Sequence, residues 1–171
     1  RLLVDVDEPA GLGKPATIRP DGGFAPTPFT AINPAVAAAG SIVSTGEDMA
    51  RYMMAQLRGS PGAGPDAQAV LSGDALTALH SRRAGNAPEA TGVGMIFFTE
   101  DWGNIRTVAH GGNWAGFHSW MTLIPELDAG VFISIMSEAP LPQASDTLRR
   151  LLMPWSRPAP SPAMLSASVY T

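Results

Sequence analysis

The sequence contains no cysteine, so a disulfide framework and thiolate metal sites are excluded. Lysine occurs once, at Lys14, and the ten arginines form only two adjacent pairs, Arg82-Arg83 and Arg149-Arg150. Nucleic-acid binding requires a clustered basic face that displaces counterions from the phosphates. This composition therefore predicts no nucleic-acid partner.

Charged residues are also scarce, at 15%, whereas hydrophobic residues make up 45% of the chain. This balance is typical of a globular protein, and 171 residues suffice for one domain with a real core. The longest nearly uncharged stretch, about residues 117–135, is interrupted by Glu126 and Asp128 and is too short to span a membrane. There is no signal peptide, and the first residue is Arg1 rather than Met. We therefore expect a fragment, a processed product or a trimmed chain.

Proline and glycine divide the chain into three parts. Residues 1–35 are rich in both, which predicts a loop segment with at most short strands. Residues 154–171 contain four prolines and are predicted to form a tail or linker. The part between them, 36–153, carries the periodic patterns of a folded domain.

Two helices are expected in the first half of that domain. Thr45 can cap the first, with Asp48 three residues later, and Gly59 ends it. Its methionines recur at helical spacing and are interpreted as a core face. A Gly- and Pro-rich loop over residues 59–66 leads to a second helix, which is capped by Ser72 and ends near His80, interpreted as a helix-end residue.

From Gly92 onward the hydrophobic period changes to two, which predicts four strands. Their ranges are Val93–Phe98, Ile105–His110, Phe117–Ile124 and Val131–Met136. The turns between them (residues 100–104, 111–116 and 125–130) are so short that neighbouring strands must be antiparallel. The last strand is apolar at nearly every position, which favours a central place in the sheet. A closing helix over residues 143–153 completes an α+β architecture, an antiparallel sheet flanked by helices.

The stretch that suggests chemistry is residues 110–117, which read HGGNWAGF. Two glycines after a strand allow close approach of a ligand to the backbone. Backbone N–H groups beside an imidazole suit acyl transfer, because they can bind an oxyanion and assist a leaving group. Taken alone, this pattern is weak, because two glycines after a strand more often form a simple turn.

Several ordered motifs make the pattern more specific. Residues 39–52 (AGSIVSTGEDMARY) and 92–95 (GVGM) resemble segments of the serine β-lactamase-like and penicillin-binding-protein-like hydrolases. That family includes class C β-lactamases, D-alanyl-D-alanine peptidases and esterases. His110-Gly111-Gly112 is similar to its His-[Gly/Thr]-Gly motif, and residues 116–126 are similar to the segment that follows it. The resemblance covers about residues 36–153.

The resemblance implies the C-terminal portion of the β-lactamase/transpeptidase-like fold, with His110, Gly111 and Gly112 on a strand that forms one wall of the active site. The backbone N–H of Asn113 would be an oxyanion donor, and His110 would assist proton transfer or hold a substrate carboxylate. Gly111, Gly112 and Asn113 would line the substrate. His118, which alternates along the next strand, is interpreted as structural, and Ser44 and Thr45 as helix caps.

The sequence departs from the family at the nucleophile. Family members use the Ser of a Ser-x-x-Lys motif, supported by a Tyr-x-Asn or Tyr-x-Ser motif. Here the residue three positions before Lys14, the single lysine, is Gly11, and neither Tyr52 nor Tyr170 begins the second motif. The resemblance implies that both motifs lie upstream, so we expect the missing N-terminal half of the domain as a partner, covalent or as a second chain. Without it we expect an unpaired sheet edge, an uncovered apolar face and no acylation by this chain alone.

The predicted function is that of a serine hydrolase acting through an acyl-enzyme on an ester, a peptide amide or a β-lactam, with no cofactor. The substrate would be a small molecule or peptide, and the resemblance suggests a periplasmic or extracellular location. The alternative is a noncatalytic binding or structural fragment with the same fold. An α/β-hydrolase would need a Gly-x-Ser-x-Gly elbow after the motif and a parallel sheet. A metal site made of the three histidines has no recognised ligand spacing.

Overall fold

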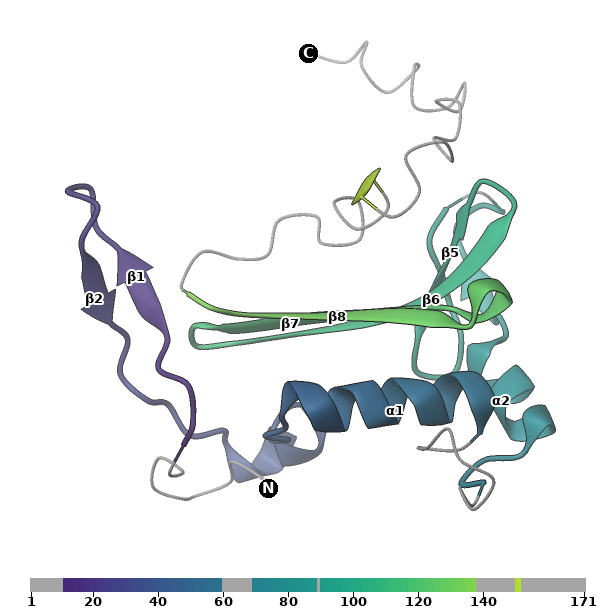
Figure 1. Cartoon of the computed structure of the whole chain (residues 1–171), viewed down its shortest axis with the longest axis horizontal. Helices are drawn as coiled ribbons and strands as arrows, with labels where there is room; N and C mark the ends of the chain where they lie inside the picture. Colours follow the sequence, from purple (N-terminus) through teal and green to yellow (C-terminus); the bar gives the residue numbers. More distant parts are fainter. Residues whose placement is uncertain (1–10, 60–68, 89, 138–149, 152–171) are drawn as a thin grey trace, which may run out of the picture.

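The computed structural model describes residues 11–59, 69–88, 90–137 and 150–151. These residues form a six-stranded antiparallel sheet, two α-helices and a separate two-stranded hairpin. Helix α1 (Gly46–Arg58) lies along one face of the sheet (Figure 1). Helix α2 (Gly73–His80) lies beyond the C-terminal end of α1. The predicted α+β class is confirmed.

Both helices begin at the predicted caps. The Thr45 hydroxyl accepts a hydrogen bond from the backbone N–H of Asp48 at 3.1 Å, and Gly59 ends α1 in the left-handed conformation at φ 78°. The Ser72 hydroxyl accepts from the N–H of Ala75 and caps α2 in the same way. Short polar side chains satisfy N–H groups that the first helical turn leaves without partners.

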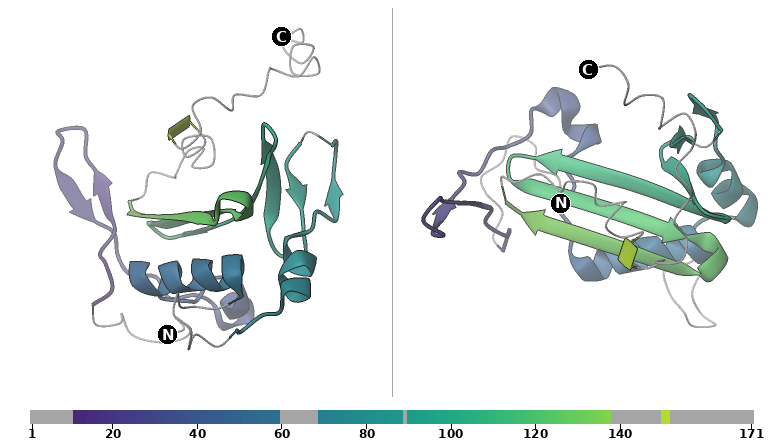
Figure 2. Two further views of the ribbon diagram at one scale, coloured as in Figure 1. Left: turned by 45° about the vertical axis from the view of Figure 1, so that its right-hand side comes forward. Right: turned by 90° about the horizontal axis from the view of Figure 1, so that it is seen from above.

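The six strands follow one another across the sheet in chain order. They are β3 (Ala84–Gly85), β4 (Gly92–Val93), β5 (Phe98–Trp102), β6 (Ile105–Trp114), β7 (Phe117–Ile124) and β8 (Ala129–Met136). Every neighbouring pair is antiparallel, as the short connections predicted. Seen from above, β6, β7 and β8 lie side by side (Figure 2).

Several strand boundaries were predicted wrongly, including the start of β8, which begins at Ala129 rather than Val131. The expected strand 93–98 is divided between β4 and β5, with residues 94–97 outside any strand. Two expected turns are much shorter than predicted: β5 runs to Trp102, and β6 runs through the double glycine to Trp114. The physical reason is that each hairpin turns over only two residues. Positive φ angles at Gly103 (67°) and at Ala115 and Gly116 (27° and 82°) allow such tight turns.

Two apolar clusters cover the two faces of the sheet. On the α1 face, Val108, Met121 and Leu123 are buried with Phe97. Met49, Met53 and Leu57 of α1 pack against them, which confirms the methionines as a core face. On the opposite face Trp102 and Ile124 are buried, with Trp120, Val131 and Ile133 packed around them.

An ion pair joins α1 to the turn before β8. The Nε and Nη2 atoms of Arg58 donate to the Asp128 carboxylate at 2.9 and 2.5 Å. The guanidinium holds the pKa of this carboxyl below its usual range by hydrogen bonding to the ionised form. Asp128 itself has a positive φ of 48°, which aspartate tolerates better than most residues.

Strand β8 does not take the central place that its composition predicted. Among the described residues it is the last strand of the sheet, and none of its side chains is fully buried. Ile135 and Met136 are 37% and 48% exposed. Beyond β8, Ser137 forms an isolated parallel bridge with Ala16. Within the described residues, the apolar composition of β8 is therefore not matched by a central position.

Residues 11–35 of the N-terminal segment contain only short strands, as expected. These are β1 (Ala16–Ile18) and β2 (Phe24–Pro26). A 3-10 helix over Pro34–Ala39 was not predicted. The predicted loop over residues 60–66 and tail over 154–171 lie outside the described residues, and so does the predicted helix over 143–153 except for Arg150 and Leu151. Among the described residues, no helix is long and apolar enough to cross a membrane.

Candidate functional site on strand β6

Strand β6 pairs with its two neighbours over different parts of its length. Its register with β7 extends to Trp114, which lies opposite Phe117. Its register with β5 ends at Ala109, opposite Phe98. Within the described part of the chain, residues 110–114 therefore have one edge that no strand covers. The HGGN motif lies on this edge.

The register also decides which backbone groups face outward. The two-residue turn over Ala115 and Gly116 makes Trp114 and Phe117 a hydrogen-bonded pair, so the N–H and C=O groups of Trp114 face β7. Because backbone direction alternates along a strand, the N–H and C=O groups of Gly112 and His110 also face β7. Those of Gly111 and Asn113 face away from it. The N–H of Arg106 supports this parity, because it donates to Glu126 just after β7 at 3.3 Å. The open edge thus presents the N–H groups of Gly111 and Asn113.

His110 begins this edge and is exposed. Its ring stacks on Phe98 with a centroid distance of 5.9 Å and meets Phe97 edge-on at 6.3 Å. Phe98 in turn stacks on Trp120 at 6.3 Å, with the two rings 3° from parallel. The imidazole is therefore held by contacts with two phenylalanine rings.

The two glycines are needed for different reasons. A methyl group on Gly111 would lie 2.5 Å from Cε3 of Trp120, so the indole excludes any side chain there. A methyl group on Gly112 would lie 3.2 Å from the Ser119 hydroxyl, which is a milder conflict. Trp120 and Phe98 were not predicted from the sequence as part of the site. Their place follows from the cross-strand register, which the two-residue turns set.

Asn113 and His118 lie directly opposite each other on β6 and β7. The Nδ1 atom of His118 is 2.7 Å from the Oδ1 atom of Asn113. The Nε2 atom of His118 is buried and has no hydrogen-bond partner among the described residues. His118, which was interpreted as a structural residue, thus makes a specific contact with Asn113 of the motif.

His80 lies on the far side of Phe97 from the motif. Its ring meets Phe97 edge-on at 5.4 Å, and its Nε2 atom is 3.0 Å from the Oε1 atom of the buried Gln56. Burial lowers the pKa of His80 below its ordinary value of 6.5, because the charged form loses hydration. These contacts agree with its interpretation as a helix-end residue. Among the described residues, no cluster of three or more His, Asp or Glu is arranged to hold a metal ion.

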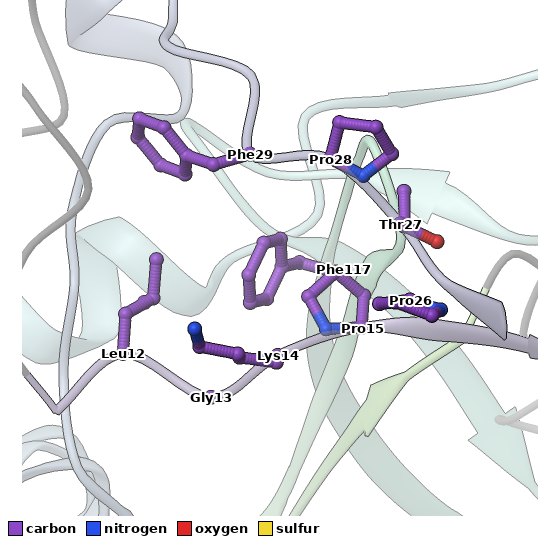
Figure 3. Close-up of a pocket in the computed structure, with 9 residues that line it drawn as sticks. All are labelled: Leu12, Gly13, Lys14, Pro15, Pro26, Thr27, Pro28, Phe29 and Phe117. Atoms are coloured by element: carbon purple, nitrogen blue, oxygen red, sulfur yellow. The ribbon is translucent and has the colours of Figure 1, made fainter. Parts of the chain in front are cut away.

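A shallow hollow of about 150 Å³ lies at the turn end of β6 and β7. Figure 3 shows the Phe117 ring between two segments of the N-terminal part of the chain, residues 12–15 and 26–29. The indole N–H of Trp114 donates to the carbonyl of Thr30 at 2.9 Å and fixes this segment beside the hairpin. The hollow is lined mainly by proline and phenylalanine and includes none of residues 110–113.

The fold and the edge define an α+β protein whose antiparallel sheet presents a His-Gly-Gly strand. Comparison with known proteins agrees: the family model described as Beta-lactamase matches residues 4–153. The chain therefore belongs to the Beta-lactamase family, and a serine hydrolase-like fold is shown. Neither the curated proteins nor the solved structures gave a match.

Proposed function

We propose that the open edge of β6 forms one wall of a serine acyl-transfer site. The observation that carries this proposal is a coincidence of two independent features. The pairing of β5 with β6 ends one residue before His110, so the motif that resembles the family's active-site strand is the part of β6 whose edge no described strand covers. An edge with outward N–H groups is what an oxyanion requires.

Each residue of the wall has a proposed role. The backbone N–H of Asn113 donates to the oxyanion that forms when a serine hydroxyl attacks the substrate carbonyl. His110 gives a proton to the leaving group or holds a substrate carboxylate. The bond from the carbonyl carbon to the leaving oxygen or nitrogen breaks as the acyl-enzyme forms, and in a β-lactam the nitrogen stays attached through the ring. Water then releases the acid and restores the serine. Gly111 and Gly112 allow the substrate to lie close to the backbone.

The serine itself is proposed to come from a segment that is not among these 171 residues, either upstream in the same chain or on a second chain. The absence of Ser-x-x-Lys from the sequence supports this. So does β8, whose apolar side chains are only half-buried at the last described place in the sheet. An additional strand along β8 would satisfy its backbone groups and cover Ile135 and Met136.

The substrate class is proposed to be an ester, a peptide amide or a β-lactam. The intact mass of the protein, measured under denaturing conditions before and after treatment with a fluorophosphonate or a penicillin, tests the assignment. We expect the 17.8 kDa species to take no adduct and a nucleophile-bearing segment, covalent or separate, to take one. An adduct on the 171-residue chain would contradict the placement of the serine. If no form carrying the upstream segment is acylated, the noncatalytic alternative is favoured.

A further inference from the structure

The contact between His118 and Asn113 has a defined direction. The carboxamide Oδ1 of Asn113 can only accept a hydrogen bond, so the Nδ1 atom of His118, 2.7 Å away, must carry the hydrogen. The two residues are cross-strand partners in the register of β6 and β7, which brings their side chains to the same face of the sheet. The bond therefore crosses the hairpin next to the open edge.

The other ring nitrogen reinforces this direction. The Nε2 atom of His118 is buried, and within the described part of the chain it has no hydrogen-bond partner. A hydrogen on Nε2 would be a buried donor without an acceptor, and it would leave Nδ1 as a second acceptor facing Oδ1. An unpaired lone pair at Nε2 costs less free energy than an unpaired buried donor and two facing acceptors together. The neutral ring is therefore expected to carry its single proton on Nδ1.

The Asn113 carboxamide is oriented as a consequence. Its Oδ1 atom is held by the ring, and Nδ2, which has two hydrogens to donate, is the end that His118 does not hold. Asn113 is exposed and belongs to the open edge, where its own backbone N–H points away from β7. Asn113 thus carries two kinds of donor at this edge: a main-chain N–H in the plane of the sheet, and a side-chain amide on the face that it shares with His118.

We propose that His118 is a positioning residue, which keeps the Asn113 side-chain amide directed at a ligand oxygen beside the oxyanion donor. This inference rests on the proposed function and narrows its substrate class. The preferred substrate carries a second acceptor oxygen, an amide carbonyl or a carboxylate, close to the carbonyl that reacts. A simple ester with no other acceptor would make no use of Nδ2.

The orientation can be tested on the 171-residue protein without any activity. The chain has three histidines, so selective ¹⁵N labelling gives three imidazole spectra, and a His118→Gln variant assigns the signals of His118. At about pH 8 we expect the hydrogen of the His118 ring to be on Nδ1 and none to be on Nε2. We expect Asn113→Ala to remove this preference. A proton on Nε2 in the unmodified protein would overturn the inference.

The positioning role is tested with benzylpenicillin, which carries an amide carbonyl and a carboxylate besides its lactam carbonyl. In the unmodified protein we expect it to shift both the backbone and the side-chain N–H signals of Asn113. His118→Phe keeps a ring but cannot hold Oδ1, so we expect about fivefold weaker binding, as for one lost neutral hydrogen bond. His118→Gln, whose amide can donate in place of Nδ1, is expected to retain most of the affinity.

The outcomes separate this inference from the proposed function. Equal affinity and equal side-chain shifts in the unmodified protein and in His118→Phe would overturn the positioning role while leaving the β6 wall in place. If benzylpenicillin shifts no signal of residues 110–113 in the unmodified protein, binding of a β-lactam at the β6 wall fails, and the donor role of Asn113 toward it fails as well. Matching amide spectra outside β6 and β7 confirm that each variant is folded.

Discussion

The indole of Trp120 lies directly over Gly111, so close that a single methyl group on the glycine would be 2.5 Å from Cε3 of the ring. Gly111 and Trp120 face each other across β6 and β7. Trp120 also stacks on Phe98, and Phe98 stacks on His110, so the three rings form a row that ends at His110.

Gly111→Ala should therefore destabilise the protein by about 1–3 kcal/mol, the usual cost of overpacking in a close contact. Urea unfolding followed by tryptophan fluorescence measures the difference. Gly112→Ala is the matched control, because its methyl group would meet only the Ser119 hydroxyl at 3.2 Å, and a hydroxyl can rotate. If both variants lose the same stability, the indole is not the cause.

Thr45→Ala should cost about 1 kcal/mol of unfolding free energy, because the hydroxyl satisfies the N–H of Asp48 at the start of α1. Ser44→Ala serves as the control: the Ser44 hydroxyl makes only a 3.5 Å contact with the Thr45 carbonyl. We expect Ser44→Ala to be nearly neutral in the same urea titration. A larger loss for Ser44→Ala than for Thr45→Ala would show that Ser44, rather than Thr45, caps α1.

Acidification should destabilise the protein through His80. Its pKa is lowered in the folded state by burial, so the unfolded chain binds a proton more readily. Stability contributed by the neutral ring is then present above the ordinary pKa of 6.5 and falls as the pH drops through that value toward the lower folded pKa. Unfolding titrations across this window should show a steeper loss for the unmodified protein than for His80→Gln. The glutamine keeps a donor for Gln56 and has no titrating ring; equal slopes would exclude His80 as the source.

Trp114→Phe should loosen the N-terminal segment from the hairpin. The variant loses the hydrogen bond from the indole to the Thr30 carbonyl, which contributes about 1 kcal/mol. Hydrogen exchange is expected to accelerate over residues 24–32, where this bond holds the segment against β6. Exchange in β5 is the internal control, since its pairing with β6 ends at Ala109, five residues before Trp114. Acceleration throughout the sheet would instead indicate a global loss of stability.

Local patterns predicted much of the fold. The caps at Thr45 and Ser72 and the glycine at position 59 set the bounds of both described helices, because capping depends on a few neighbouring residues. The strand over Phe117–Ile124 was predicted with its observed bounds, and the antiparallel pairing followed from connection length. The order of motifs predicted the family.

The hairpin turns were predicted less well. Glycine and asparagine in GNI and GGNW mark turns statistically, but the pairing of whole strands decides where the chain reverses. In the first hairpin, Trp102 and Ile105 pair and leave only two residues for the turn. In the second, the double glycine is extended strand, and Ala115 takes the positive φ.

The sequence by itself determined the helix bounds, the antiparallel strands and the motif residues His110, Gly111, Gly112 and Asn113, because these depend on short spacings along the chain. Only the tertiary structure decided that β5 ends before the motif, that Trp120 covers Gly111, and that His118 holds Asn113. These relationships depend on register between strands. Register is set by the turns and by the packing of both faces at once, and a one-residue change would move every side chain to the other face.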